Sequence, residues 1–166
     1  MLGRAWRTAA FASFVLVASP ALAVSPTAQA TGTARIYKPL TITKIQDLDF
    51  GTVILGAGAF TGETVTVSTA GAVTCGSGTG KITCSGSPKS AKFRLVGTAN
   101  ANVTLTSPGF NLTGPSTLAV TPSSTSQTVT LTAGPLDVSL GASVSVASTT
   151  PDGIYTGTWT VTADYQ

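Results

Sequence analysis

The side chains best able to do chemistry in this chain are two cysteines, a pair of aspartates and a group of basic residues. Cys75 and Cys84 are separated by eight residues, three of which are glycine. Such a glycine-rich stretch is typical of a hairpin, so we expect the two cysteines to lie across one and to form a disulfide. Zinc is the alternative, but two thiolates are too few ligands and the sequence contains no histidine. The disulfide would contribute roughly 2–3 kcal/mol of stability by closing a short loop.

Two aspartates form the second candidate group. Asp47 and Asp49 lie two residues apart, so on a strand both carboxylates would share one face. That arrangement is compatible with calcium binding or acid–base chemistry. The alternative, which we favour, is a solvent-facing strand edge or turn.

The third candidate group is a run of basic residues with no acidic residue between positions 71 and 95. Its members are Lys81, Lys89, Lys92 and Arg94. A concentration of positive charge can bind an anionic glycan or surface polymer. A solvated face that binds nothing is the alternative.

Groups needed for catalysis are missing from the sequence. The lack of histidine excludes Ser-His-Asp and Cys-His nucleophile systems. Gly76, Gly78 and Gly80 alternate, but no helical pattern follows them, as a phosphate-binding loop would require. We therefore expect a protein that is not an enzyme and holds no cofactor or metal.

The N-terminal residues have the three parts of a secretory signal, which we place at residues 1–23. Arg4 and Arg7 supply the positive region, an apolar run of about ten residues follows, and Ala21-Leu22-Ala23 is a small-x-small cleavage site. Ala28-Gln29-Ala30 is an alternative cleavage site. The signal predicts export to the periplasm, the cell surface or the medium, and no later apolar stretch is long enough to span a membrane.

The rest of the chain has the composition of an all-β domain. Residues 24–166 carry seven basic and six acidic side chains, so their net charge of +1 does not indicate a nucleic-acid-binding protein. Threonine and valine, which favour strands, alternate in short segments bounded by Gly, Pro or Ser every 8–12 residues. This spacing predicts an immunoglobulin-like antiparallel β-sandwich of about seven strands over residues 35–166.

Residues 24–34 precede this domain and are expected to form a flexible N-terminal arm. Small side chains alternate there with polar ones, at Ala28, Ala30, Gly32 and Ala34, and Ile36 continues the pattern. The period of two is that of an extended strand, and plain disorder is the alternative.

The C-terminal segment shows the strongest alternation in the sequence. After a Pro151-Asp152-Gly153 turn, apolar residues alternate with threonines and other polar residues to the last position. A strand of this kind needs a core on one side and water on the other. The apolar face carries Tyr155, Trp159, Val161 and Tyr165.

Three segments resemble a known family. These segments, PLTITKIQDLDFGTV, KFRLVGTANANVTLT and DGIYTGTWTVTADYQ, resemble the domain of unknown function 4402, a family of small exported bacterial proteins. The resemblance runs from about Arg35 to Gln166. It implies a relationship to spore coat protein U and to fimbrial subunits.

The C-terminal segment also resembles that of chaperone–usher pilins, which have a penultimate Tyr and a Gly fourteen positions from the end. Tyr165 and Gly153 occupy those positions here. The resemblance implies a sandwich that lacks one strand and a C-terminal strand that pairs with a periplasmic chaperone before an outer-membrane usher assembles the subunits. A neighbouring copy or related subunit would then insert its N-terminal arm, residues 24–36 here. We therefore expect a structural subunit of a fimbria-like or surface-coat assembly, with a self-contained glycan-binding or anion-binding module as the alternative.

Overall fold

The computed structural model describes residues 25–166, and the predicted signal peptide lies outside them. The chain divides into two units, residues 1–35 and 36–166. Within the first unit, residues 25–35 form neither helix nor strand. The second unit contains the strands and no helix, so no helix in the described part of the chain could cross a membrane.

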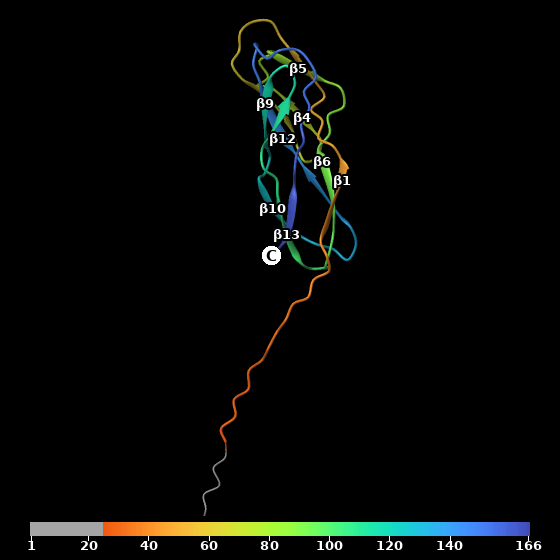
Figure 1. Cartoon of the computed structure of the whole chain (residues 1–166). Helices are drawn as coiled ribbons and strands as arrows, with labels where there is room; N and C mark the ends of the chain where they lie inside the picture. Colours follow the sequence, from red (N-terminus) through yellow and green to blue (C-terminus); the bar gives the residue numbers. More distant parts are fainter. Residues whose placement is uncertain (1–24) are drawn as a thin grey trace, which may run out of the picture. The chain divides into compact units, whose positions relative to one another are not determined.

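The domain is built from thirteen short strands (Figure 1). They are β1 (Thr41–Gln46), β2 (Thr52–Leu55), β3 (Glu63–Val67), β4 (Val73–Cys75), β5 (Ile82–Ser85), β6 (Ala91–Val96), β7 (Asn102–Thr106), β8 (Phe110–Thr113), β9 (Thr117–Pro122), β10 (Ser126–Thr130), β11 (Leu136–Leu140), β12 (Ala142–Val146) and β13 (Thr162–Tyr165).

The strands are more numerous than the seven or so expected because several long strands are interrupted. Gly141 alone separates β11 from β12, and Ser107-Pro108-Gly109 separates β7 from β8. Proline has no N–H to give to a sheet ladder, and glycine lets the backbone bend. At each interruption the chain leaves one sheet and joins another.

The strands form four antiparallel sheets that enclose two adjoining parts of one core. The orders are β1-β6-β11, β10-β7-β13, β4-β3-β12-β9-β8 and β2-β5. The first two sheets enclose a cluster that includes Phe93, Leu95, Val103 and Leu105. The other two enclose a second cluster. The all-β antiparallel sandwich predicted from the sequence is confirmed.

The Cys75–Cys84 disulfide is confirmed, with the two Cα atoms 5.8 Å apart, but the predicted hairpin around it is wrong. β4 pairs with β3 and β5 pairs with β2, so the disulfide joins two different sheets. The glycines between the cysteines have left-handed backbone angles, with φ of +61°, +78° and +73° at Gly76, Gly78 and Gly80. They carry the chain across the end of the sandwich instead of reversing it between paired strands.

Candidate functional site

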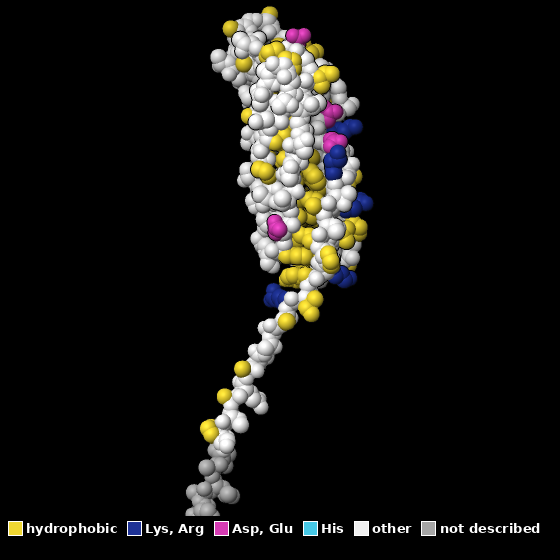
Figure 2. Space-filling model, in the orientation of Figure 1, with side chains coloured by type: hydrophobic (Ala, Val, Ile, Leu, Met, Phe, Trp, Pro, Cys, Tyr) yellow, Lys and Arg dark blue, Asp and Glu magenta, His cyan; other side chains and the backbone are white. Residues whose placement is uncertain are grey.

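An open apolar groove runs along one side of the domain, between its first and last strand segments. Its sides are formed by residues 44–55 and 150–159, and its volume is about 1150 Å³. Figure 2 shows hydrophobic side chains lying uncovered along this face, between the positions of β1 and β13 in Figure 1. On another side, the disulfide joins the β5 edge of the β2-β5 sheet to the β4 edge of the five-stranded sheet. The sandwich is therefore open on one side and covalently closed on another.

The first side of the groove has an unpaired backbone edge. β1 hydrogen-bonds only to β6, and β2 only to β5. Between them, Asp49 exchanges two backbone hydrogen bonds of 2.9 Å with Lys89. The site prediction from the sequence did not include this side. The alternation of Asp47 and Asp49 with Leu48 and Phe50 was the signal that could have found it.

The second side is the C-terminal segment, which the sequence predicts as one strand over Gly153–Gln166. This prediction is corrected, because the segment pairs regularly with β7 only over β13. Nearer its start, it makes one isolated bridge, between Thr156 and Thr113. The break lies opposite Pro108, which has no N–H to offer. The Trp159 Nε1–H instead donates to the Pro108 carbonyl oxygen, at 2.9 Å.

The alternation of the C-terminal segment survives this break. The side chains of Tyr155, Trp159, Val161 and Tyr165 are half-buried, while the residues between them are mostly exposed. Gly153, where the segment begins, has a φ of +150°, and a Cβ there would overlap the Pro115 side chain. These four side chains thus lie on one face of the segment, and two of them, Tyr155 and Trp159, line the groove.

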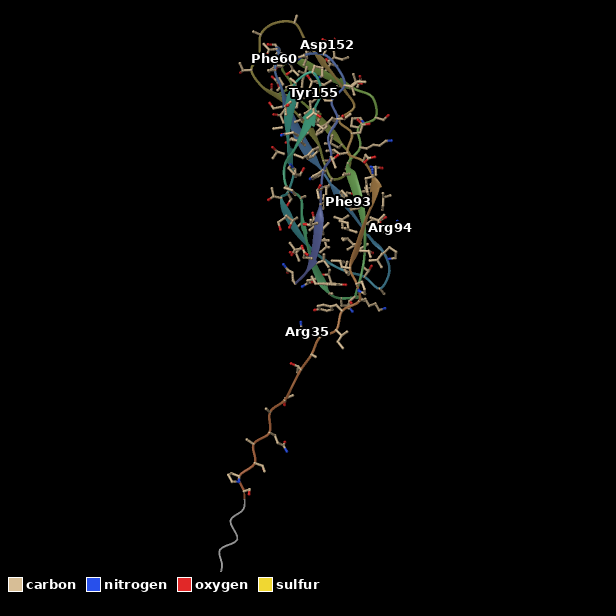
Figure 3. All side chains as sticks on the ribbon, viewed as in Figure 1. Arg35, Phe60, Phe93, Arg94, Asp152 and Tyr155 are labelled. Atoms are coloured by element: carbon tan, nitrogen blue, oxygen red, sulfur yellow. A yellow bond between two sulfur atoms is a disulfide. The ribbon has the colours of Figure 1, made fainter. Side chains whose placement is uncertain are left out.

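Aromatic rings from three segments meet at the floor of the groove. The Trp159 ring stacks on Phe110, with centroids 5.3 Å apart, and meets Phe93 edge-on at 6.5 Å. Phe93 points from β6 into the sandwich, while the adjacent Arg94 points outward (Figure 3). Trp159 packs against both core clusters. Trp159 therefore joins the two parts of the core from the C-terminal side of the groove, as Leu48 does from the first side.

The four predicted basic residues do not form one cluster of free charge. Arg94 makes a two-pronged ion pair with Asp137, at 2.7 and 2.8 Å, because β11 lies beside β6. This pairing raises the pKa of Arg94 and lowers the pKa of Asp137. Lys92 faces Ser139 in the same sheet, whereas Lys81 lines a separate hollow with residues 59–61 and 147–149. Figure 2 shows basic side chains spread along one edge of the molecule with acidic ones among them.

The two aspartates also have separate partners. The Asp47 carboxylate lies 2.7 Å from the Lys44 ammonium group, and the Asp49 carboxylate accepts the Gly51 N–H at 2.8 Å. Within residues 25–166 there is no group of three or more acidic, Cys or His side chains able to hold a metal ion. Both aspartates behave as exposed turn and edge residues.

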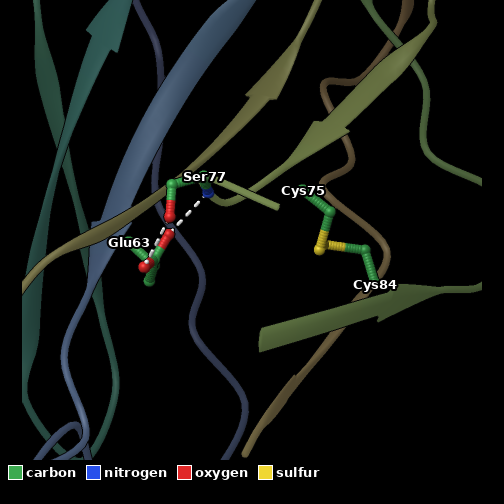
Figure 4. The surroundings of a disulfide bond; sticks show 4 residues. All are labelled: Glu63, Cys75, Ser77 and Cys84. Carbon is green, nitrogen blue, oxygen red and sulfur yellow. Dashed lines mark hydrogen bonds between the residues drawn. A yellow bond between two sulfur atoms is a disulfide. The ribbon is translucent and has the colours of Figure 1, made fainter. Parts of the chain in front are cut away.

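A buried carboxylate that the sequence prediction missed lies beside the disulfide. Glu63 is 7% exposed, and its carboxylate accepts the Ser77 N–H at 2.6 Å and the Ser77 hydroxyl at 2.9 Å (Figure 4). The Thr79 hydroxyl adds a longer contact of 3.3 Å. The hydrogen bonds from Ser77 hold the pKa of Glu63 below its ordinary value. Ionised Glu63 thus anchors the glycine-rich loop between the two cysteines.

We expect Glu63→Gln to reduce the acid sensitivity of the domain. Because the folded-state pKa of Glu63 lies below the unfolded-state value, its contribution to stability is present above the unfolded value and is lost as pH falls through the folded one. Urea unfolding at about pH 7 and about pH 3 should show a smaller loss of stability in Glu63→Gln than in the wild type. Asp152→Asn, which changes an exposed carboxylate, is the control. Parallel pH profiles for wild type and Glu63→Gln would contradict the prediction.

Comparison with known proteins identifies the family of this chain. No curated protein and no solved structure matches the chain significantly. One family model does match, over residues 40–165, which include both sides of the groove and nearly the whole sandwich. The chain therefore belongs to the family described as Domain of unknown function (DUF4402).

Proposed function

We propose that this protein is an exported structural subunit of a fimbria-like or surface-coat assembly, and that its copies are joined by strand exchange. The observation that carries the proposal is the groove, which has unpaired backbone on both sides and an apolar floor. Exposed strand edges beside uncovered apolar side chains favour aggregation unless another strand covers them. An inserted strand would satisfy the backbone groups and bury the floor together.

The proposed occupant is residues 24–36 of another copy. The apolar positions of this arm carry small side chains, from Ala28 to Ala34. The groove floor supplies the large ones, above all Phe93, Phe110 and Trp159. Large side chains on one surface pack well against small ones on the facing strand. About twelve extended residues span roughly 40 Å, and the first side of the groove, residues 44–55, contains a similar number of residues.

Export and assembly partners belong to the same proposal. A periplasmic chaperone would cover the groove until an outer-membrane usher brings two subunits together. The disulfide is typical of an oxidising compartment outside the cytosol. No catalytic role is proposed: of the charged residues that line the groove, Lys44 and Asp47 pair with each other and Asp49 accepts the Gly51 N–H.

A self-contained binding module is the second candidate. It is favoured by the hollow of about 610 Å³ at one end of the domain, where Lys81 lies with the hydroxyl side chains of Thr61, Ser148 and Thr149. A cation beside hydroxyl groups suits an acidic sugar. This candidate requires a stable monomer, in which the groove is either covered or does not cause aggregation.

An unboiled and a boiled denaturing gel of the surface fraction of the native host test the proposal. Strand exchange predicts a ladder of multiples that collapses to one band on boiling, because subunits locked by a complete inserted strand dissociate slowly. A single monomer band in both lanes would overturn the proposal and favour the binding module.

A further inference from the structure

The residues at which the N-terminal arm joins the domain are fixed by hydrogen bonds to the other end of the chain. The Tyr165 hydroxyl accepts the Thr98 N–H at 2.8 Å and donates to the Lys38 carbonyl oxygen at 2.9 Å. The Lys38 N–H donates to the Thr98 hydroxyl at 2.6 Å, and the ring of Tyr37 stacks on that of Tyr165 with centroids 4.6 Å apart. We call Tyr37, Lys38, Thr98 and Tyr165 the clasp.

The clasp is tightly packed against the core. A Cβ at Gly97 would overlap the Tyr165 hydroxyl, so this position has room only for glycine. Leu40 and Tyr165 both pack against the core cluster that includes Leu95 and Leu105. Residues 37–40 are therefore held in place immediately before β1. Ile36, the next residue toward the arm, is 91% exposed.

An arm that filled its own groove would have to reverse at these same residues. β1 begins at Thr41 and borders the groove, so a hairpin over residues 37–40 is the shortest connection by which the arm could pair with its free edge. Two-residue hairpin loops require a positive φ at their first central residue. Pro39 fixes its own φ near −65° and restricts Lys38 to extended conformations. A reversal would also break both hydrogen bonds made by the Lys38 backbone.

We infer that the clasp and Pro39 prevent the arm from entering its own groove and so direct it to another copy. This inference rests on the proposed function, since it concerns which groove the arm fills. Tyr165 acts here as a positioning residue: it holds the root of the arm through Lys38 and does not itself contact the inserted strand.

A triple variant that opens the clasp and supplies a hairpin turn tests this inference. Lys38→Asn with Pro39→Gly creates an Asn-Gly pair, which favours a type I′ turn, and Tyr165→Phe removes the hydroxyl that binds Lys38. We expect this variant to run as a monomer on an unboiled gel, with the ladder lost. Limited trypsin digestion after Arg35 reports the position of the arm, because an inserted strand resists cleavage. Cleavage at Arg35 should be at least about tenfold slower in the monomeric variant than in wild-type monomers.

Thr130→Val is the matched control, since it removes a side-chain hydroxyl that donates to the Asn102 side chain on β7, away from the groove and the clasp. It should retain the ladder. A triple variant that still forms the wild-type ladder, or a monomer that is cut rapidly at Arg35, would overturn the role of the clasp while leaving strand exchange intact. A wild-type protein that is itself monomeric, with Arg35 protected, would overturn both.

Discussion

Trp159→Ala should lower the free energy of unfolding by about 3 kcal/mol, within the range found for truncating a large aromatic residue in a core. Trp159 packs against both core clusters, stacks on Phe110 and meets Phe93 edge-on. Its Nε1–H also holds the C-terminal segment against Pro108 where regular strand pairing is interrupted. Its removal therefore costs packing in both clusters and releases one side of the groove. Urea unfolding followed by far-UV circular dichroism measures the loss.

Two further variants separate these contributions. Trp159→Phe keeps a ring but removes the hydrogen bond to Pro108, so we expect a smaller loss that includes about 1 kcal/mol from that bond. Ile154→Ala, in the same segment, changes a side chain that is 85% exposed and should alter stability by no more than about 0.5 kcal/mol. Equal losses for Trp159→Ala and Ile154→Ala would mean that Trp159 does not join the two clusters.

The parts of the fold that could be predicted from the sequence are those set by local patterns. The half-buried face of the C-terminal segment follows directly from its period of two. The disulfide follows from the cysteine count and from the predicted export signal. In neither case is it necessary to know which strands pair.

The parts that were missed depend on contacts between distant segments. A glycine-rich link between Cys75 and Cys84 fits a hairpin locally, but β4 and β5 gain more by pairing with β3 and β2. The basic run appears free of acids in the sequence, yet Asp137 lies opposite Arg94 across β11 and β6. The groove likewise exists only because the first and last segments become edges of facing sheets.

Placing aspartates on the apolar face of the arm should abolish assembly, whereas placing them on the polar face should not. Ala30→Asp with Ala34→Asp would turn two carboxylates toward the groove floor if the arm inserts as a strand. Thr31→Asp with Thr33→Asp introduces the same charge one position away, on the face that would meet solvent. Burying an unpaired carboxylate costs roughly 3 kcal/mol or more, so the first variant should bind at least about 100-fold more weakly. Loss of the ladder on an unboiled gel measures the effect.

The comparison tests the geometry of insertion and not merely the need for an arm, because both variants have the same length, composition class and net charge. If the two variants lose the ladder equally, the arm does not bind as a strand with alternating faces, and its contribution is electrostatic or nonspecific. If only the alanine positions are sensitive, the arm is an inserted strand.

A chain starting at Tyr37 tests the direction of donation. It retains the clasp and the groove but has no arm to donate. Mixed with the full chain, it should shorten the ladder by ending each assembly at the subunit that cannot donate.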